Sequence, residues 1–160
     1  MPQMIFVNLP VTDLDRSIAF YKAIGAEQNM QFSDSTAAMM SFSAEVNVMI
    51  LTHDKYRQFT AKPIADAHAS SQVLLCLSSE TRDAVDAMVA GAAGAGGVPD
   101  PGQVQEHGFM YGRSFEDPDG HHWEVMWMDM AALGGTQAAG ADAGHSADAP
   151  DAVQAAVRAE

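Results

Sequence analysis

The sequence has little cysteine, few basic residues and no long apolar run. Cys76 is the only cysteine in 160 residues, so no disulfide can form within the chain and the composition fits a reducing cytoplasm. Lysine and arginine together number 8 against 21 acidic residues, and the net charge of −13 repels nucleic-acid phosphates and anionic lipids. No apolar run approaches the roughly 18 residues of a membrane span. We therefore expect a cytoplasmic protein with a small-molecule ligand and with no nucleic-acid or membrane partner.

Residues 131–160 differ in composition from the rest of the chain. Alanine, glycine and aspartate dominate this stretch, which has no aromatic residue and only Leu133, Val153 and Val157 as larger aliphatic residues. Such a segment cannot bury enough apolar surface to offset the entropy lost when it becomes ordered. We therefore expect a single domain over residues 1–130 and a disordered tail over residues 131–160.

Within residues 1–130 the same order of elements occurs twice: a strand, a helix and three strands. Alternating aliphatic residues predict the strands, and residues that cap helices precede each helix, Thr12 with Asp13 in the first copy and Ser78 with Ser79 in the second. The strands of the first copy are expected near residues 5–11, 26–33, 37–43 and 46–52, and those of the second near 72–77, 98–106, 109–116 and 121–128. We expect module one over about residues 4–52, a connecting segment over 53–70 and module two over about 71–129.

The second copy ends in a hairpin whose last strand carries one acidic side chain among apolar residues. The Asp-Pro-Asp-Gly sequence at residues 117–120 is typical of a turn, because proline fixes φ and glycine accepts a positive φ. On the strand that follows, alternation places His122, Glu124 and Met126 on one face. A glutamate beside tryptophan, valine and methionine is costly to bury. Glu124 is therefore predicted to face a pocket.

Two segments together resemble the vicinal oxygen chelate (VOC) superfamily, which contains glyoxalase I, bleomycin-resistance proteins, fosfomycin-resistance proteins and extradiol dioxygenases. One segment runs from Val11 to Tyr21 and is followed by Gly25, and the other runs from Phe115 to Glu124. The resemblance implies an α+β fold of two βαβββ modules, whose strands form one curved, eight-stranded mixed sheet around a cup. It also implies helices on the outer face of that sheet and a homodimer.

Catalytic members of this superfamily hold a divalent metal in the cup, through ligands on the first and last strand of each module. Carried onto this chain, the resemblance places these four positions at Phe6, Ile50, Gln72 and Glu124. Phe6 and Ile50 cannot ligate a metal, whereas catalytic zinc sites typically use three protein ligands. The sequence therefore favours a cup without the full metal site. Gln72, His122 and Glu124 are the candidate ligands if a divalent metal binds.

Glu124 is the candidate catalytic residue of the predicted cup. It could ligate a metal, act as a general base or anchor a cationic ligand. Its structural alternative is a hydrogen bond from Asn8 or Gln72. The other residues expected to line the cup and contact a substrate are Phe6, Asn8, Ile50, Gln72, Leu74, Met110, Ser114 and Met126. His122 shares the face of Glu124, and its alternative is a solvent-facing position just after the turn.

Two functions are compatible with these residues, and the sequence leaves both open. The first is binding, in which the cup holds a small, partly apolar ligand around Glu124 without a required cofactor, as in bleomycin-resistance proteins. The alternative is a metal-dependent enzyme that uses Glu124, Gln72 and His122 and is similar to glyoxalase I, a lactoylglutathione lyase, or to an extradiol dioxygenase. A structural dimer with a collapsed pocket is a third interpretation.

Overall fold

The computed structural model describes residues 2–134 of the chain. Its contacts divide the chain into two compact units, Met1–Asp129 and Met130–Glu160. The first unit contains every described strand, and of the second unit only the short helix α4 (Met130–Gly134) is described. The tail predicted for residues 131–160 therefore overlaps α4 at residues 131–134. The rest of that tail lies outside the described residues. None of the described helices is long and apolar enough to cross a membrane.

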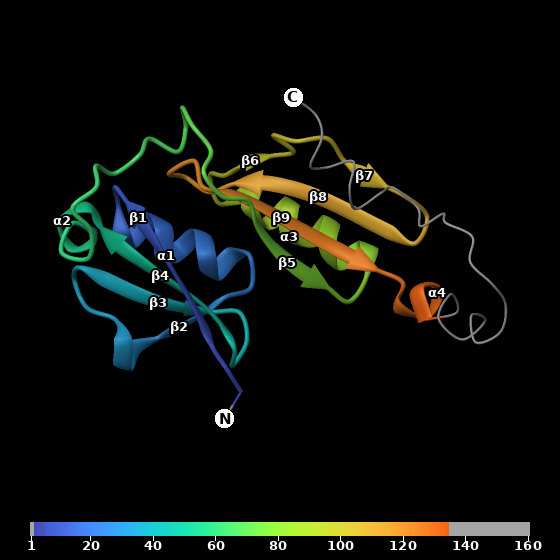
Figure 1. Ribbon diagram of the computed structural model, residues 1–160, viewed down its shortest axis with the longest axis horizontal. Coiled ribbons are helices and arrows are strands. Elements are labelled where there is room, and N and C mark those ends of the chain that lie inside the picture. Colours follow the sequence, from blue (N-terminus) through green and yellow to red (C-terminus); the bar gives the residue numbers. More distant parts are fainter. Residues whose placement is uncertain (1, 135–160) are drawn as a thin grey trace, which may run out of the picture. The chain divides into compact units, whose positions relative to one another are not determined.

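Module one forms a four-stranded sheet with one long helix (Figure 1). It consists of β1 (Ile5–Val11), α1 (Leu14–Ala23), β2 (Glu27–Asn29), the 3-10 helix η1 (Met30–Phe32), β3 (Ala37–Ser41) and β4 (Val46–Thr52). The strand order is β1-β4-β3-β2, in which β1 and β4 run parallel and the other pairs run antiparallel. Of the two expected cap residues, Thr12 and Asp13, it is Asp13 that caps α1: its carboxylate accepts a hydrogen bond from the backbone N–H of Arg16 at 3.0 Å.

Module two repeats this order after a connecting segment that contains α2 (His53–Tyr56). It consists of β5 (Leu75–Ser79), α3 (Arg82–Gly94), β6 (Val98–Pro99), β7 (Gln105–Glu106), β8 (Met110–Glu116) and β9 (His122–Met128). The strand order is β5-β9-β8-β6, with β7 also paired to β8. Thr81 caps α3 in place of the expected Ser78 and Ser79, because β5 continues to Ser79.

Two expected strands of module two differ from the structure. The strand expected over residues 72–77 begins only at Leu75, and the one expected over residues 98–106 is split into β6 and β7. Pro101 lacks a backbone N–H with which to extend a ladder, and Asp100 has a φ of 49°, which turns the chain between the two short strands. Alternation alone did not signal this break.

The predicted α+β fold of two βαβββ modules with mixed pairing is confirmed, but its strands form two sheets rather than one. Among residues 2–134, β1 pairs only with β4 and β5 pairs only with β9, so no strand pairing joins the two modules. A continuous eight-stranded sheet would need such a ladder between β1 and β5. Each of these outer strands instead has one edge without a partner strand among the described residues.

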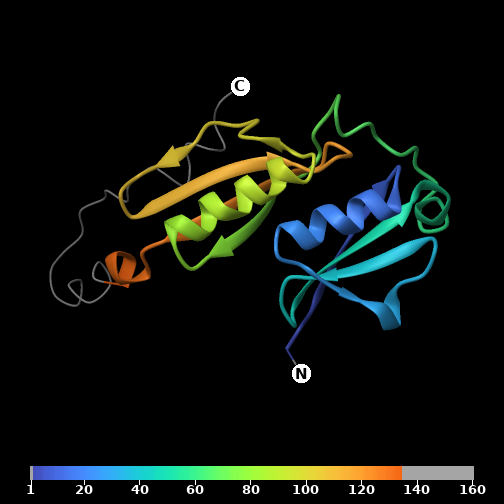
Figure 2. The same ribbon diagram turned by 180° about the vertical axis from the view of Figure 1, so that it is seen from behind.

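One hydrophobic core is shared by both modules. α1 and α3 lie on the same side of the two sheets (Figures 1 and 2) and contact each other. A Cβ on Gly91 of α3 would lie 2.7 Å from the carbonyl oxygen of Ala23 in α1, so glycine permits this close approach. Phe20 of α1 packs against Phe115 of the second sheet, with ring centroids 6.0 Å apart. The face of each sheet turned away from this core is its open face.

Candidate functional site

The open face of the second sheet carries Glu124 near its centre. Cross-strand pairing places Cys76 of β5 on one side of Glu124 and Ser114 of β8 on the other. Trp123 and Val125 point to the opposite face and are buried in the core, as alternation predicts. By the same alternation, this open face also carries the side chains of Ser78, Met110, Glu116, His122, Met126 and Met128, with Leu74 just before β5.

Glu124 is half-buried, and its carboxylate has no hydrogen-bond or ion-pair partner among the described residues. It is therefore free to accept a hydrogen bond or a positive charge from a ligand. Partial burial, together with the neighbouring Glu124 carboxylate, raises the pKa of the Cys76 thiol. Cys76 is thus a neutral thiol at neutral pH, and it contributes a small, weakly polar surface rather than a nucleophile.

The open face of the first sheet does not carry Ile50, so the prediction that Ile50 lines the cup is wrong. Ile50 is fully buried in the core, and its neighbour Met49 points to the open face, where it lies opposite Asn8. Residues 46–52 are largely apolar on both faces of the strand, so the sequence pattern could not decide which face is open, and a shift of one residue exchanges the two. Phe6 and Asn8 do lie on the open face.

Gln72 also lies elsewhere than expected. Because β5 begins at Leu75, Gln72 belongs to the connecting segment and not to the opening strand of module two. Leu74 directly precedes that strand and is 54% exposed. The residue that directly precedes β5 is therefore the apolar Leu74, whereas Gln72 was expected to supply a polar side chain there.

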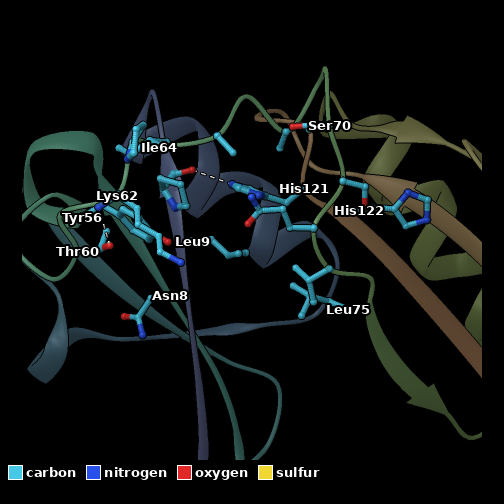
Figure 3. Close-up of a pocket in the computed structure, with 18 of the residues that line it drawn as sticks. Asn8, Leu9, Tyr56, Thr60, Lys62, Ile64, Ser70, Leu75, His121 and His122 are labelled. Carbon is cyan, nitrogen blue, oxygen red and sulfur yellow. Dashed lines mark hydrogen bonds between the residues drawn. The ribbon is translucent and has the colours of Figure 1, made fainter.

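A cavity of about 300 Å³, the linker cavity, lies beneath the connecting segment (Figure 3). Its other walls are the middle of β1 and the turn end of β8 and β9. Its polar lining comes from Asn8, Tyr56, Lys62, Gln72, Glu116 and His122, and its apolar lining from Leu9, Pro63, Ile64, Val73 and Leu75. Asn8, Gln72 and His122, all predicted site residues, thus meet at this cavity. The Glu124 side chain does not line it.

The turn between β8 and β9 contacts both the connecting segment and β1. Nε2 of His121 lies 2.8 Å from the carbonyl oxygen of Pro10, to which it donates a hydrogen bond when it carries the proton (Figure 3). Gly120 has a φ of 88°, and a Cβ at this position would lie 2.7 Å from the backbone nitrogen of His68. Glycine meets both requirements, so the turn sequence also positions one wall of the linker cavity.

The same turn secures the first helix of module one. Oδ1 of Asp119 accepts hydrogen bonds from the backbone N–H of Thr12 at 2.9 Å and from the Thr12 hydroxyl at 2.6 Å. The guanidinium of Arg16 lies 3.4 Å from the same oxygen. Thr12 directly precedes Asp13, the cap of α1. One carboxylate of module two therefore fixes the start of a helix that lies about a hundred residues earlier in the chain.

Asp117 makes a second link between the modules, within the core. Its buried carboxylate accepts a hydrogen bond from the Tyr21 hydroxyl at 2.9 Å, and that hydroxyl accepts one from Nε1 of Trp123 at 3.2 Å. The backbone N–H groups of Asp119 and His121 also donate to Asp117. Burial raises the pKa of both Asp117 and Tyr21, and the Asp117 carboxylate raises that of Tyr21 further. Sequence reasoning missed these contacts because local turn chemistry already explained the aspartates.

The residues predicted to ligate a metal do not fit a metal centre within one chain. Among residues 2–134, no three His, Cys, Asp or Glu side chains lie close enough together to hold a metal ion. Phe6 and Met49 offer no hard donor for a divalent ion on the first sheet. Gln72 and His122 line the linker cavity, whereas Glu124 lies on the open face outside it.

Comparison with known proteins agrees with this fold. Residues 3–125 match the family described as Glyoxalase/Bleomycin resistance protein/Dioxygenase superfamily. No curated protein matches the chain. Among solved structures, the hypothetical protein SA1046 from S. aureus is similar, with 25% sequence identity and a TM-score of 0.66 over 79% of this chain and 94% of that one.

Two further solved structures share the fold at lower identity. A glyoxalase/bleomycin resistance protein/dioxygenase family enzyme from Burkholderia phytofirmans PsJN has 18% identity and a TM-score of 0.63, over 79% of this chain and 99% of that one. The fosfomycin resistance protein FosX from Listeria monocytogenes has 20% identity and a TM-score of 0.58, over 79% and 91%. At this level of identity the likeness concerns the fold alone.

Proposed function

Because the chain belongs to the Glyoxalase/Bleomycin resistance protein/Dioxygenase superfamily, we propose that it is a binding protein that holds a small, partly apolar ligand around Glu124. The observation that carries this proposal is the unpartnered Glu124 carboxylate at the centre of an open sheet face. The ligand is held without the superfamily's full metal site, because Phe6 and Met49 offer no hard donor for a divalent ion.

The side chains around Glu124 favour a ligand with one positive or hydrogen-donating group on an apolar body. A carboxylate without a counter-charge is best satisfied by an ammonium or an N–H group. Met110 and Met126 lie on the same face, and their flexible thioethers adapt to irregular apolar shapes. The net charge of −13 also raises the concentration of cations near the surface.

The protein is proposed to act as a cytoplasmic homodimer in which a second copy covers the open faces. Phe6, Leu74 and Met128 expose 47%, 54% and 37% of their surface there. In addition, β1 and β5 each have one edge without a partner strand among the described residues. Exposed apolar side chains and unpaired strand edges both favour association with another surface. A ligand at Glu124 would then be enclosed between the two copies.

A metal-dependent lyase or dioxygenase is the second candidate function. Gln72 and His122 both line the linker cavity, and His122 lies on the same strand and face as Glu124, two residues before it. These three side chains are the donors that such an enzyme would use.

Calorimetric titration with two matched probes tests the binding proposal: 1-naphthylmethylamine, which is cationic at neutral pH, and the neutral 1-naphthylmethanol. We expect Glu124→Gln to weaken the amine about tenfold, the factor that corresponds to about 1.4 kcal/mol, and to leave the alcohol unchanged. Asp15→Asn is the matched control, because it removes the same charge from an exposed position on α1.

Two results would overturn the binding proposal. If Asp15→Asn weakens the amine as much as Glu124→Gln does, the effect comes from net charge and not from a site. If the protein binds Ni²⁺, Zn²⁺, Mn²⁺ or Fe²⁺ tightly and Glu124→Gln, Gln72→Ala and His122→Ala each abolish that binding, the metal-dependent enzyme replaces the binding protein.

A further inference from the structure

Asn47 of β4 holds a buried polar atom that the described residues leave without a partner. The residue is 1% exposed, and its Oδ1 accepts a hydrogen bond from the Ser41 hydroxyl at 2.7 Å. Its Nδ2 has no hydrogen-bond partner in the part of the chain that the structure describes. Leaving a buried donor unpaired costs more free energy than an average hydrogen bond contributes, so such a group calls for an explanation.

The unpaired atom does not depend on how the amide of Asn47 is oriented. Exchanging its oxygen and nitrogen would let Nδ2 donate to the Ser41 hydroxyl, but Oδ1 would then be the buried atom without a partner. Ser41 satisfies one end of the amide in either orientation. The other end therefore has no partner among the described residues in either orientation.

Asn47 lies in the lining of a cavity of about 490 Å³ on the open face of the first sheet. Cross-strand pairing sets Glu27 of β2, Ser41 of β3 and Asn47 of β4 in one row across this face. The apolar part of the lining comes from Met4, Met39 and Phe42. A cavity of this volume is large enough for a small organic molecule.

The lining carries one charged side chain, that of Glu27, and no lysine, arginine or histidine. An anionic ligand is therefore disfavoured, and a cationic one can pair with the Glu27 carboxylate. We propose that this cavity, the Asn47 pocket, binds a small amine that bears a hydroxyl or carbonyl oxygen next to an apolar group. The ammonium pairs with Glu27, the oxygen accepts a hydrogen bond from Nδ2 of Asn47, and the apolar group contacts the two methionines.

This site goes beyond the binding proposed at Glu124. The Asn47 pocket is built entirely from module one, whereas Glu124 and its neighbours belong to module two. The two sites can therefore be tested separately, and failure of one leaves the other standing.

Three probes of nearly equal size separate the contributions to binding: 2-amino-1-phenylethanol, phenethylamine without the hydroxyl, and 1-phenylethanol without the amine. Binding is followed by the NMR shifts of the Asn47 side-chain amide and of the backbone amides of β2, β3 and β4. We expect the amino alcohol to bind in the millimolar range or tighter, and each of the other two probes to bind about tenfold more weakly.

Two variants assign the two polar contacts of the amino alcohol. Glu27→Gln should weaken both amines about tenfold and leave 1-phenylethanol unchanged, whereas Glu45→Gln, a nearby exposed carboxylate outside the pocket, should change nothing. The double variant Ser41→Ala/Asn47→Leu replaces both partners of a partly buried hydrogen bond by apolar groups, a change that a fold tolerates well. It should abolish the preference for the amino alcohol over phenethylamine.

The proposal fails if no saturable shift of these amides occurs in the millimolar range, or if the double variant keeps the preference for the hydroxyl group. It also fails if Glu124→Gln weakens the amino alcohol as much as Glu27→Gln does, because the probe would then occupy the site on module two.

Discussion

The two modules have the same order of elements, but their equivalent hairpin turns make different contacts. In the turn between β3 and β4, the Ser43 hydroxyl accepts hydrogen bonds from the backbone N–H groups of Glu45 and Val46, at 3.2 and 3.1 Å, so its partners are local. In the turn between β8 and β9, Asp119 binds Thr12 and Asp117 binds Tyr21, both in the other module.

This difference separates two parts of the sequence motif on which the family resemblance rests. The aspartates of residues 117–120 hold the modules together and are satisfied by the protein itself. Glu124, seven residues after Asp117, has no partner among the described residues and is available to a ligand. Residues close together in a motif can thus have separate tasks, one structural and the other proposed to be binding.

The largest effect expected from this comparison is that of Asp117→Ala. The substitution leaves the buried Tyr21 hydroxyl and two backbone N–H groups without their acceptor, and we expect a loss of about 3 kcal/mol in the free energy of unfolding. Ser43→Ala in the equivalent turn of module one should cost about 1 kcal/mol or less, since its partners are exposed. Urea unfolding of both variants measures the difference, and equal losses would contradict the contrast between the turns.

A second, smaller effect tests the close contact between the helices. Gly91→Ala would place Cβ 2.7 Å from the Ala23 carbonyl oxygen, so α1 and α3 must move apart, at a cost of about 1–3 kcal/mol. Gly94→Ala is the matched control in the same helix, because a Cβ there meets no atom within 4 Å. Alanine favours the helix, so Gly94→Ala should raise the melting temperature and Gly91→Ala should lower it. Two increases would show that the helices are not in close contact.

The smallest expected effect is an opposite pH dependence of two aspartates, one in each module. Burial raises the pKa of Asp117, whereas hydrogen bonds from Thr36 lower the pKa of Asp34. A free aspartate has a pKa of about 3.9. Above that pH, folded protein holds the proton of Asp117 more tightly than unfolded protein does, so its contribution to stability falls as pH rises. Because the pKa of Asp34 is lowered, its contribution to stability is present above about pH 4 and is lost as pH falls.

Urea unfolding of Asp117→Asn, Asp34→Asn and the unchanged protein at several pH values measures these two contributions. The stability difference between the unchanged protein and Asp117→Asn should shrink as pH rises from about 4 toward neutrality. The difference for Asp34→Asn should shrink as pH falls below about 4. Curves that run parallel for all three proteins would contradict both assignments.

Much of the fold could be predicted from the sequence because its signals are local. The Asp13 cap of α1 acts within three residues, and alternation correctly assigned Glu124 and Trp123 to opposite faces of β9. The position carried over from the resemblance was wrong for Ile50, and alternation could not correct it, because β4 is apolar on both faces and only the position of α1 decides which one is covered. Gln72 was misplaced because nothing local marks where β5 begins.

The candidate site was less predictable than the fold. The polar residue with the strongest structural signal, Asn47, lies in a strand that reads as apolar core, and its unpaired Nδ2 is apparent only from its neighbours in space. The linker cavity likewise combines Asn8 of β1 with Gln72 and His122, which are far apart in the chain.

By itself, the sequence determined the order of elements, the duplication and the place of Glu124 on its strand, because each depends on residues within a turn or two of one another. Only the tertiary structure decided that Asp117 and Asp119 bind residues 96 and 107 positions away. It also decided that the strands form two sheets and that Nδ2 of Asn47 has no hydrogen-bond partner among the described residues. These features depend on how separate elements pack against one another, and no local period in a sequence encodes that packing.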